Sequence, residues 1–297
     1  MNSNYWFSIA ELTIKLIFKE DGLNNLSLLP SFSPFEIAEP SKEDNLFELT
    51  IDDKTAPIAK SERVRIKTID TGNGNIIVDQ TNDGRHQFII KDINGNSCCL
   101  LIANKEFSVC QCALNGNYDM RSFGLNNAIM IAYAFASCKY NTLLIHASLV
   151  RQNGYGYAFI AKSGTGKSTQ VSMWLKHLPS CDLMNDDNPI IRIIDNVPVI
   201  YGSPWSGKTP CYRNIKAHLG AITQIDRAPQ NSIDRLSPID ALVNFIPACS
   251  SIRWDENIYD DIIRNITQVI EKTPFYILHC LPNKEAAVIC NKTISRT

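Results

Sequence analysis

The alternation of apolar and polar residues predicts strands through the first part of the chain. Period-two stretches cover residues 9–18, 46–51 and 64–69, and shorter apolar runs lie at 75–78, 87–91, 98–102 and 107–110. Such alternation turns one face of a strand to a core and the other to solvent. Turn-forming residues separate the runs, most clearly at 92–96, so the pattern predicts a meander of hairpins. We interpret residues 1–115 as a β-rich region with a structural or partner-recognition role.

The pattern changes in the second part of the chain. Apolar residues at helical spacing over 122–137 predict a helix that leads into the second half of the chain. Strand patterns follow at 143–150, 157–161, 181–184, 189–194, 197–201, 219–225 and 275–279, and helical patterns at 171–178, 238–245 and 257–272. Asn153-Gly154 predicts a hairpin turn. The fold class is therefore α/β (α+β), with a β-rich region at 1–115 and a second domain with a mixed sheet at 116–297.

One glycine-containing loop sits between a predicted strand and a predicted helix. Residues 161–169 read Ala-Lys-Ser-Gly-Thr-Gly-Lys-Ser-Thr and fit the phosphate-loop pattern, with Ala in the first position. Its two glycines allow a tight turn whose N–H groups face an anion, Lys167 can reach the outer phosphates, and Ser168 can hold Mg²⁺. The competing interpretation is a chance turn. The candidate nucleotide-binding residues are Ser163, Gly164, Thr165, Gly166, Lys167, Ser168 and Thr169.

An acidic pair follows the loop by one predicted helix and one predicted strand. The strand predicted over 181–184 runs into Asn185, Asp186 and Asp187, and two adjacent acids at the end of a buried strand are costly unless a cation or a partner is present. One carboxylate can hold Mg²⁺ and the other can take a proton from an attacking hydroxyl. The alternative is a solvated turn that caps the strand end.

Other polar residues accompany this chemistry. His146 lies in an apolar strand adjacent in sequence to the loop strand, where it serves either the site or the core. Lys208 and Arg213, in and after a glycine- and proline-rich loop, are possible phosphate clamps or ordinary exposed cations. Trp205 either stacks on a base or packs in the core, and packing is the commoner role.

His146, the loop at 161–169 and the Asp186-Asp187 pair, in this order, resemble the catalytic domain of HPr kinase/phosphorylase, a P-loop fold of the phosphoenolpyruvate carboxykinase type. The resemblance is good over 143–201. It implies that the Gly164–Ser168 backbone and Lys167 bind ATP phosphates and that Ser168 binds Mg²⁺. It also implies that Asp186 is the base toward a Ser/Thr hydroxyl, with Asp187 near the metal and His146 beside the pair.

The chain departs from that family in its loop and its N-terminal part. Ala161 stands where the family usually has Gly, and Lys162 where it has an acid. No phosphorylase signature follows in the C-terminal half, and residues 1–115 do not resemble the usual α/β regulatory domain. The loop at 204–208 looks more like divergent HPr-kinase-related proteins, some of which are thought to modify peptides.

Composition restricts the class of partner. The 29 basic and 30 acidic residues give a formal net charge of −1, so we expect no nucleic-acid partner and no membrane partner. No signal peptide or spanning segment is recognisable, which favours a cytoplasmic protein. Most of the ten cysteines lie in apolar runs, which favours reduced structural thiols over disulfides, and Cys110-Gln111-Cys112 lacks a second pair for zinc.

Three functions remain open on the sequence. The first is an ATP- and Mg²⁺-dependent kinase acting on a Ser or Thr hydroxyl of a protein or peptide. The second is a small-metabolite kinase with the same site. The third is a non-catalytic nucleotide-binding module whose β-rich part recognises a partner. The sequence does not settle the acceptor, the reverse reaction or whether the chain forms a homo-oligomer.

Overall fold

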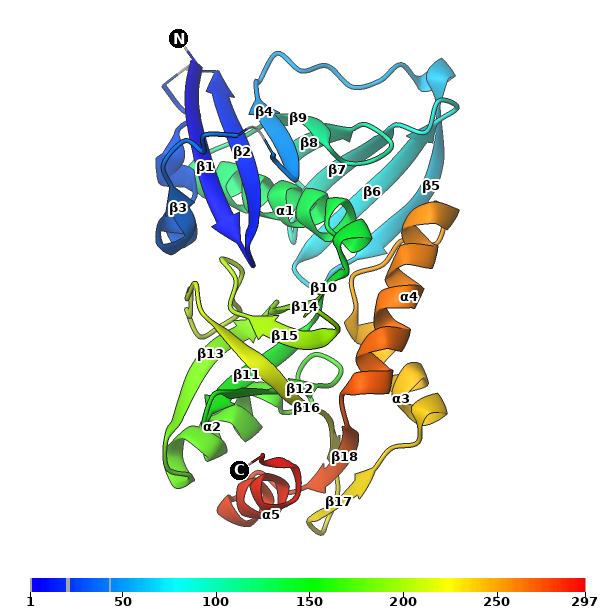
Figure 1. The fold of residues 1–297 in the computed structure, drawn as a ribbon. Helices are drawn as coiled ribbons and strands as arrows, with labels where there is room; N and C mark the ends of the chain where they lie inside the picture. Colours follow the sequence, from blue (N-terminus) through cyan, green and yellow to red (C-terminus); the bar gives the residue numbers. More distant parts are fainter. Residues whose placement is uncertain (1, 20–21, 43, 297) are drawn as a thin grey trace. The chain divides into compact units, whose positions relative to one another are not determined.

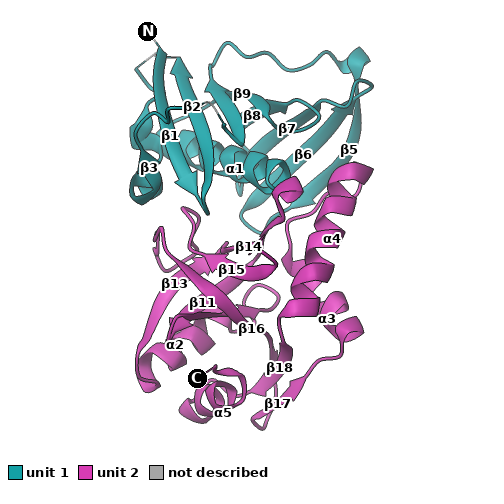
Figure 2. Cartoon of the chain, in the orientation of Figure 1, with its two compact units in different colours: residues 1–137 teal, residues 138–297 magenta. Residues whose placement is uncertain are grey.

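The chain is a mixed α/β protein divided into two compact units, residues 1–137 and 138–297 (Figures 1 and 2). The computed structural model describes residues 2–19, 22–42 and 44–296. Among these described residues, each unit has a nine-stranded mixed sheet. Helix α1 (Tyr118–Ala136) packs on the sheet of unit 1, so the boundary between the units follows this helix, whereas the sequence pattern had placed it between residues 115 and 116.

Unit 1 begins with a hairpin. Strands β1 (Asn2–Ile9) and β2 (Leu12–Lys19) pair antiparallel, so β2 forms most of the period-two stretch predicted over 9–18 and a turn interrupts its start. The turn is formed by Ala10 and Glu11, whose φ angles are 46° and 63°. Residues other than Gly, Asn and Asp rarely adopt positive φ, so this turn has no sequence signature.

The sheet of unit 1 has the order β3-β1-β2-β4-β9-β8-β7-β6-β5. Strands β5 to β9 form an antiparallel meander, which confirms the hairpins predicted there, whereas β4 pairs parallel with both β2 and β9. The strand bounds are β3 (Glu36–Ile37), β4 (Phe47–Ile51), β5 (Arg63–Asp70), β6 (Gly74–Thr81), β7 (His86–Asp92), β8 (Ser97–Ala103) and β9 (Val109–Leu114).

Helix α1 packs on β7, β8 and β9. It starts at Asn117, whose side chain accepts a hydrogen bond from the Met120 N–H. Close approach to β8 depends on Gly124, where an added Cβ would lie 2.8 Å from the Cys98 carbonyl oxygen. The absence of a side chain at this position therefore sets the distance between helix and sheet.

The sheet of unit 2 has the order β10-β14-β15-β16-β12-β11-β13, and β18 pairs with β16 and β17. Hairpins β11–β12 and β14–β15 confirm the predicted pairs, while β12 runs parallel to β16 and β16 parallel to β18. The bounds are β10 (Thr142–Leu144), β11 (Ala147–Gln152), β12 (Tyr155–Ile160), β13 (Cys181–Asp187), β14 (Ile190–Ile194), β15 (Val197–Tyr201), β16 (Lys216–Arg227), β17 (Ser232–Arg235) and β18 (Phe275–Cys280).

Two helices of unit 2, α2 (Lys167–His177) and α5 (Lys284–Ile294), pack against each other and share one core. Its centre is Trp174, fully buried with its ring 5.3 Å from Tyr157 and 5.5 Å from Phe159. The remaining helices are α3 (Pro238–Phe245) and α4 (Glu256–Lys272), both as the periodicity predicts. Within the described ranges, no helix combines the length and apolarity needed to cross a membrane.

All ten cysteines are free, as predicted, and nine of them are buried. Burial raises the pKa of the Cys138 thiol to about 12 and that of Cys181 to about 11. At neutral pH these thiols stay protonated, so they behave as small apolar side chains rather than as nucleophiles.

We expect Gly124→Ala to lower the free energy of unfolding of unit 1. Inserting a methyl group against the Cys98 carbonyl costs about 1–3 kcal/mol. This cost outweighs the roughly 1 kcal/mol by which Ala is favoured over Gly in a helix. Asn126→Ala on the same helix is the matched control and should be neutral or slightly stabilising. Urea unfolding of the full chain measures both variants, and equal stability of Gly124→Ala and wild type would contradict the packing argument.

Candidate active site

The phosphate loop has the strand–loop–helix setting that its motif requires. Strand β12 ends at Ile160 and α2 starts at Lys167. Gly164 and Gly166 have φ angles of 76° and 132°, which residues with a Cβ rarely adopt. The Thr165 N–H donates to the Lys162 carbonyl over 3.2 Å and closes the turn. The loop therefore leads into the first turn of α2, whose N–H groups have no partner within the helix and can bind an anion.

Arg227, which the sequence analysis did not single out, holds this loop. It ends β16, the strand parallel to β12, and its Nε donates to the Thr165 carbonyl over 2.9 Å while Nη2 donates to the Gly164 carbonyl. In a planar trans peptide the N–H points away from the preceding carbonyl, so the Gly166 N–H is turned away from Arg227. The guanidinium thus fixes the orientation of the peptides between Gly164 and Gly166.

Three oxygen atoms meet where α2 faces the paired strands β11 and β13. Ser148 lies opposite Asp186 in this antiparallel ladder, and directly opposed side chains lie on the same face. The Ser148 hydroxyl donates to Asp186 Oδ1 over 2.6 Å, and the Ser168 hydroxyl donates to the same atom over 2.9 Å. The two hydroxyl oxygens are 3.4 Å apart. Ser148 and Asp186 are buried, whereas Ser168 is exposed, so the oxygen cluster is open on the side of the helix start.

A second chain of contacts joins the loop lysine to the other acid. Lys167 Nζ lies 2.8 Å from His146 Nε2, and His146 Nδ1 lies 2.9 Å from Asp187 Oδ1. An ammonium has no acceptor, so Lys167 donates to Nε2 and the imidazole proton is assigned to Nδ1, which donates to Asp187. His146 is therefore a neutral bridge between a buried cation and a carboxylate. The structure thus brings together Lys167, Ser168, His146 and both acids.

Burial lowers the pKa of the Lys167 ammonium, while the negative charges of Asp187 and Asp186 act in the opposite direction. A lysine whose pKa is lower in the folded than in the unfolded protein opposes folding while it is charged, and this penalty fades only as pH rises toward the unfolded value near 10.4. At neutral pH the site therefore holds a cation that an anionic ligand would stabilise.

The loop after β15 is hydrogen-bonded to the backbone of the acidic pair. Ser206 forms an antiparallel bridge with Asp187, and the Gly207 N–H donates to the Asp186 carbonyl. A Cβ at Gly207 would lie 2.9 Å from that carbonyl oxygen. Asn185 adds hydrogen bonds from its side chain to Ser203 and Trp205. The exposed residues 207–210 consequently run beside the acids.

The two possible phosphate clamps differ in their surroundings. Lys208 directly follows Gly207, is exposed, and makes no side-chain hydrogen bond or ion pair within the described part of the chain. Arg213 is not brought to the acidic pair: its Nη1 lies 2.6 Å from Asp182 Oδ2, near the start of β13, whereas Asp187 ends that strand. Arg151 shares this carboxylate at 2.8 Å. The position of Arg213 is thus explained by an ion pair.

The other predicted residues lie where their sequence positions imply. Ser163 and Thr169 are exposed on either side of the turn, and Thr165 is half-buried. Trp205 is 5% exposed, which fits the packing role and leaves its ring little surface for a base. Ser148 was missed because a serine in an apolar run has no signature until its strand is paired with the strand that carries Asp186.

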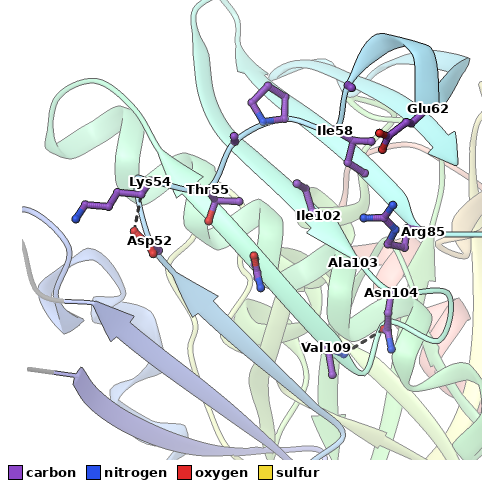
Figure 3. Close-up of a pocket in the computed structure, with 14 residues that line it drawn as sticks. Asp52, Lys54, Thr55, Ile58, Glu62, Arg85, Ile102, Ala103, Asn104 and Val109 are labelled. Atoms are coloured by element: carbon purple, nitrogen blue, oxygen red, sulfur yellow. Dashed lines mark hydrogen bonds between the residues drawn. The ribbon is translucent and has the colours of Figure 1, made fainter.

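Unit 1 carries a separate pocket of about 670 Å³ (Figure 3). The segment after β4 forms one wall, with Lys54 and Ile58, and the adjoining ends of β8 and β9 form the floor, with Ile102 and Val109. No residue of the phosphate loop and neither member of the acidic pair lines it. Its lining mixes charged, polar and apolar side chains and contributes no residue to the site described above.

Comparison of the chain with protein-family models and with curated protein sequences finds no match. The interpretation of the site therefore depends on its geometry and donor chemistry. Mg²⁺ prefers oxygen ligands, and the cluster of Ser168, Asp186 and Ser148 offers three oxygens within hydrogen-bonding distance of one another. The residues present fit the cation that the sequence predicted.

We expect Lys167→Met to abolish stabilisation by ATP without lowering the melting temperature of the ligand-free protein. Removing the ammonium removes both the desolvation penalty and the charge for the outer phosphates. ATP at 100 times its Kd should stabilise the wild type by about 2.7 kcal/mol. Thermal unfolding with and without ATP measures both effects.

Lys176→Met is the matched control, because Lys176 is an exposed lysine on the same helix. It should keep the full ATP-dependent shift. An unchanged shift in Lys167→Met would remove this lysine from the nucleotide site.

Proposed function

We propose that the protein is an ATP- and Mg²⁺-dependent phosphotransferase, a serine/threonine kinase that acts on a hydroxyl of a protein or peptide. One observation carries the proposal: the first two residues of α2 contact both halves of the acidic pair, Ser168 directly and Lys167 through His146. Phosphate-binding and proton-accepting groups thus face the same point, as transfer of a phosphoryl group to a hydroxyl needs.

The nucleotide side of the site would be formed by the loop. The N–H groups at the start of α2 would receive the phosphates, and Lys167 would turn from His146 to the outer phosphates. Ser168 and Asp186 would hold Mg²⁺, whose charge offsets that of the β- and γ-phosphates. Arg227 would keep the loop in its binding conformation through the two carbonyls that it holds.

Exposure distinguishes the roles of the two acids. Asp186 is 4% exposed and accepts hydrogen bonds from two serines, whereas the Asp187 and His146 side chains are 32% and 42% exposed. A base must reach the acceptor hydroxyl. We therefore assign Asp186 to the cation and the Asp187–His146 pair to the base, the reverse of the roles that the family resemblance implies for the two acids.

The proton transfer follows from the hydrogen bonds of His146. Once Lys167 leaves Nε2 for the phosphates, that nitrogen has a free lone pair and takes the proton of the acceptor hydroxyl. The hydroxyl oxygen bonds to the γ-phosphorus, the bond from this phosphorus to the β,γ-bridging oxygen breaks, and ADP leaves with the electron pair. Asp187, which accepts from Nδ1–H, stabilises the imidazolium that forms.

The surface beside the acids suits a polypeptide acceptor. Residues 207–210 are exposed and run next to Asp187, to which Ser206 is bridged. An open flank of this kind admits an extended segment carrying a Ser or Thr. A small-metabolite kinase would use the same residues with an enclosed acceptor pocket. Phosphate transfer from labelled ATP to a Ser/Thr peptide library, compared with a panel of small alcohols, separates the two acceptors.

We expect Asp187→Asn to lower kcat by about 10²–10⁴-fold while ATP affinity stays within about twofold, because general-base catalysis contributes on that order. Asp186→Asn should instead raise the Mg²⁺ concentration needed for half-maximal rate. Steady-state kinetics at varied ATP and Mg²⁺ give both results. Full turnover by Asp187→Asn would exclude it from the base, and absence of transfer to any acceptor by the wild type would leave only nucleotide binding.

A further inference from the structure

The oxygen triangle of Ser148, Ser168 and Asp186 has the dimensions of one face of a magnesium coordination sphere. Its edges are 2.6, 2.9 and 3.4 Å. With Mg–O bonds of about 2.0–2.1 Å and octahedral geometry, adjacent ligand oxygens are about 2.9 Å apart. The edge between Ser168 and Asp186 equals that spacing, the edge between Ser148 and Asp186 is shorter, and the edge between the two serines is longer by about half an ångström.

The neighbouring acid is engaged elsewhere. Asp187 uses Oδ1 for His146 and Oδ2 for the side-chain amide of Asn188, at 2.9 and 2.8 Å. Among the described residues, no group of three or more His, Cys, Asp or Glu side chains is placed to hold a metal. A third protein oxygen beside Ser168 and Asp186 therefore has to come from a neutral group, and Ser148 is the one in contact with both.

We propose that the Ser148 hydroxyl oxygen is a direct ligand of the divalent cation, completing a three-oxygen protein face with Ser168 and Asp186. The inference rests on the proposed function, because it takes the cation to be the one that accompanies ATP. It also gives a role to a hydroxyl that is 1% exposed, at a position where a polar group is costly unless it is bonded.

A serine with a purely structural role would also donate its hydroxyl hydrogen bond to Asp186. Replacing the hydroxyl oxygen with sulfur distinguishes a serine that binds the cation from one that only orients the carboxylate. Sulfur in the same place remains a weak hydrogen-bond donor, but as a ligand it favours soft cations over Mg²⁺. A serine that only orients the carboxylate would give no such change in metal preference.

The test compares the ATP dissociation constant in EDTA with those in saturating Mg²⁺ and in Cd²⁺, so no turnover is needed. For Ser148→Ala we expect ATP affinity in EDTA within twofold of wild type and a tenfold or greater loss of the tightening by Mg²⁺. For Ser148→Cys we expect Mg²⁺ to tighten ATP binding only weakly and Cd²⁺ to restore the tightening. The ratio of the ATP dissociation constant in Mg²⁺ to that in Cd²⁺ should be at least tenfold higher than in the wild type.

Ser137→Ala, which removes a buried hydroxyl in unit 1, is the control and should match wild type in every condition. Unchanged Mg²⁺ tightening in Ser148→Ala would overturn the inference, as would a loss in Ser148→Cys that Cd²⁺ does not recover. If Ser148→Ala is unfolded by circular dichroism, Ser148→Cys decides alone. A wild type that binds no ATP in any condition would instead defeat the proposed function, before any variant is compared.

Discussion

The site depends on the burial of one ammonium group at the start of a helix. The N-terminal end of α2 carries partial positive charge, so a lysine at its first position is opposed by the helix dipole as well as by desolvation. The Ala161 carbonyl, 3.1 Å away, and the neutral His146 are its hydrogen-bond partners. The chain thus holds a cation against two unfavourable terms, which is the arrangement expected where an anion is to be bound.

Strand pairing brings the two acids to the start of this helix. Ala147 and Ser148 on β11 face Asp187 and Asp186 on β13, so residues distant in sequence reach one end of the helix. Asp186 enters the oxygen cluster through Ser148 and Ser168. Asp187 ends β13 with a φ of 156°, outside regular strand geometry, and reaches His146. The antiparallel register therefore brings both carboxylates to the start of α2, where they have different partners.

The sequence predicted the parts of the site that are local and left open those that need long-range pairing. The loop, its flanking strand and helix, and the acidic pair follow from spacing and periodicity. Ser148 and Arg227 could not be found this way, because each acts on a residue far along the chain. Similarly, the Ala10-Glu11 turn was missed because its positive φ angles occur at residues that give no turn signal. Arg213 was included for its charge, but its distance from the acids is decided by the ion pair with Asp182.

The contact between Arg227 and the loop has an evolutionary consequence. Because the guanidinium binds main-chain oxygens, it recognises the path of the backbone and is indifferent to the side chains along it. A change of side chain at Thr165 can therefore leave its carbonyl, and the peptide plane that carries it, in place. The identity of that residue is then a poorer guide to the shape of the turn than the two carbonyl contacts are.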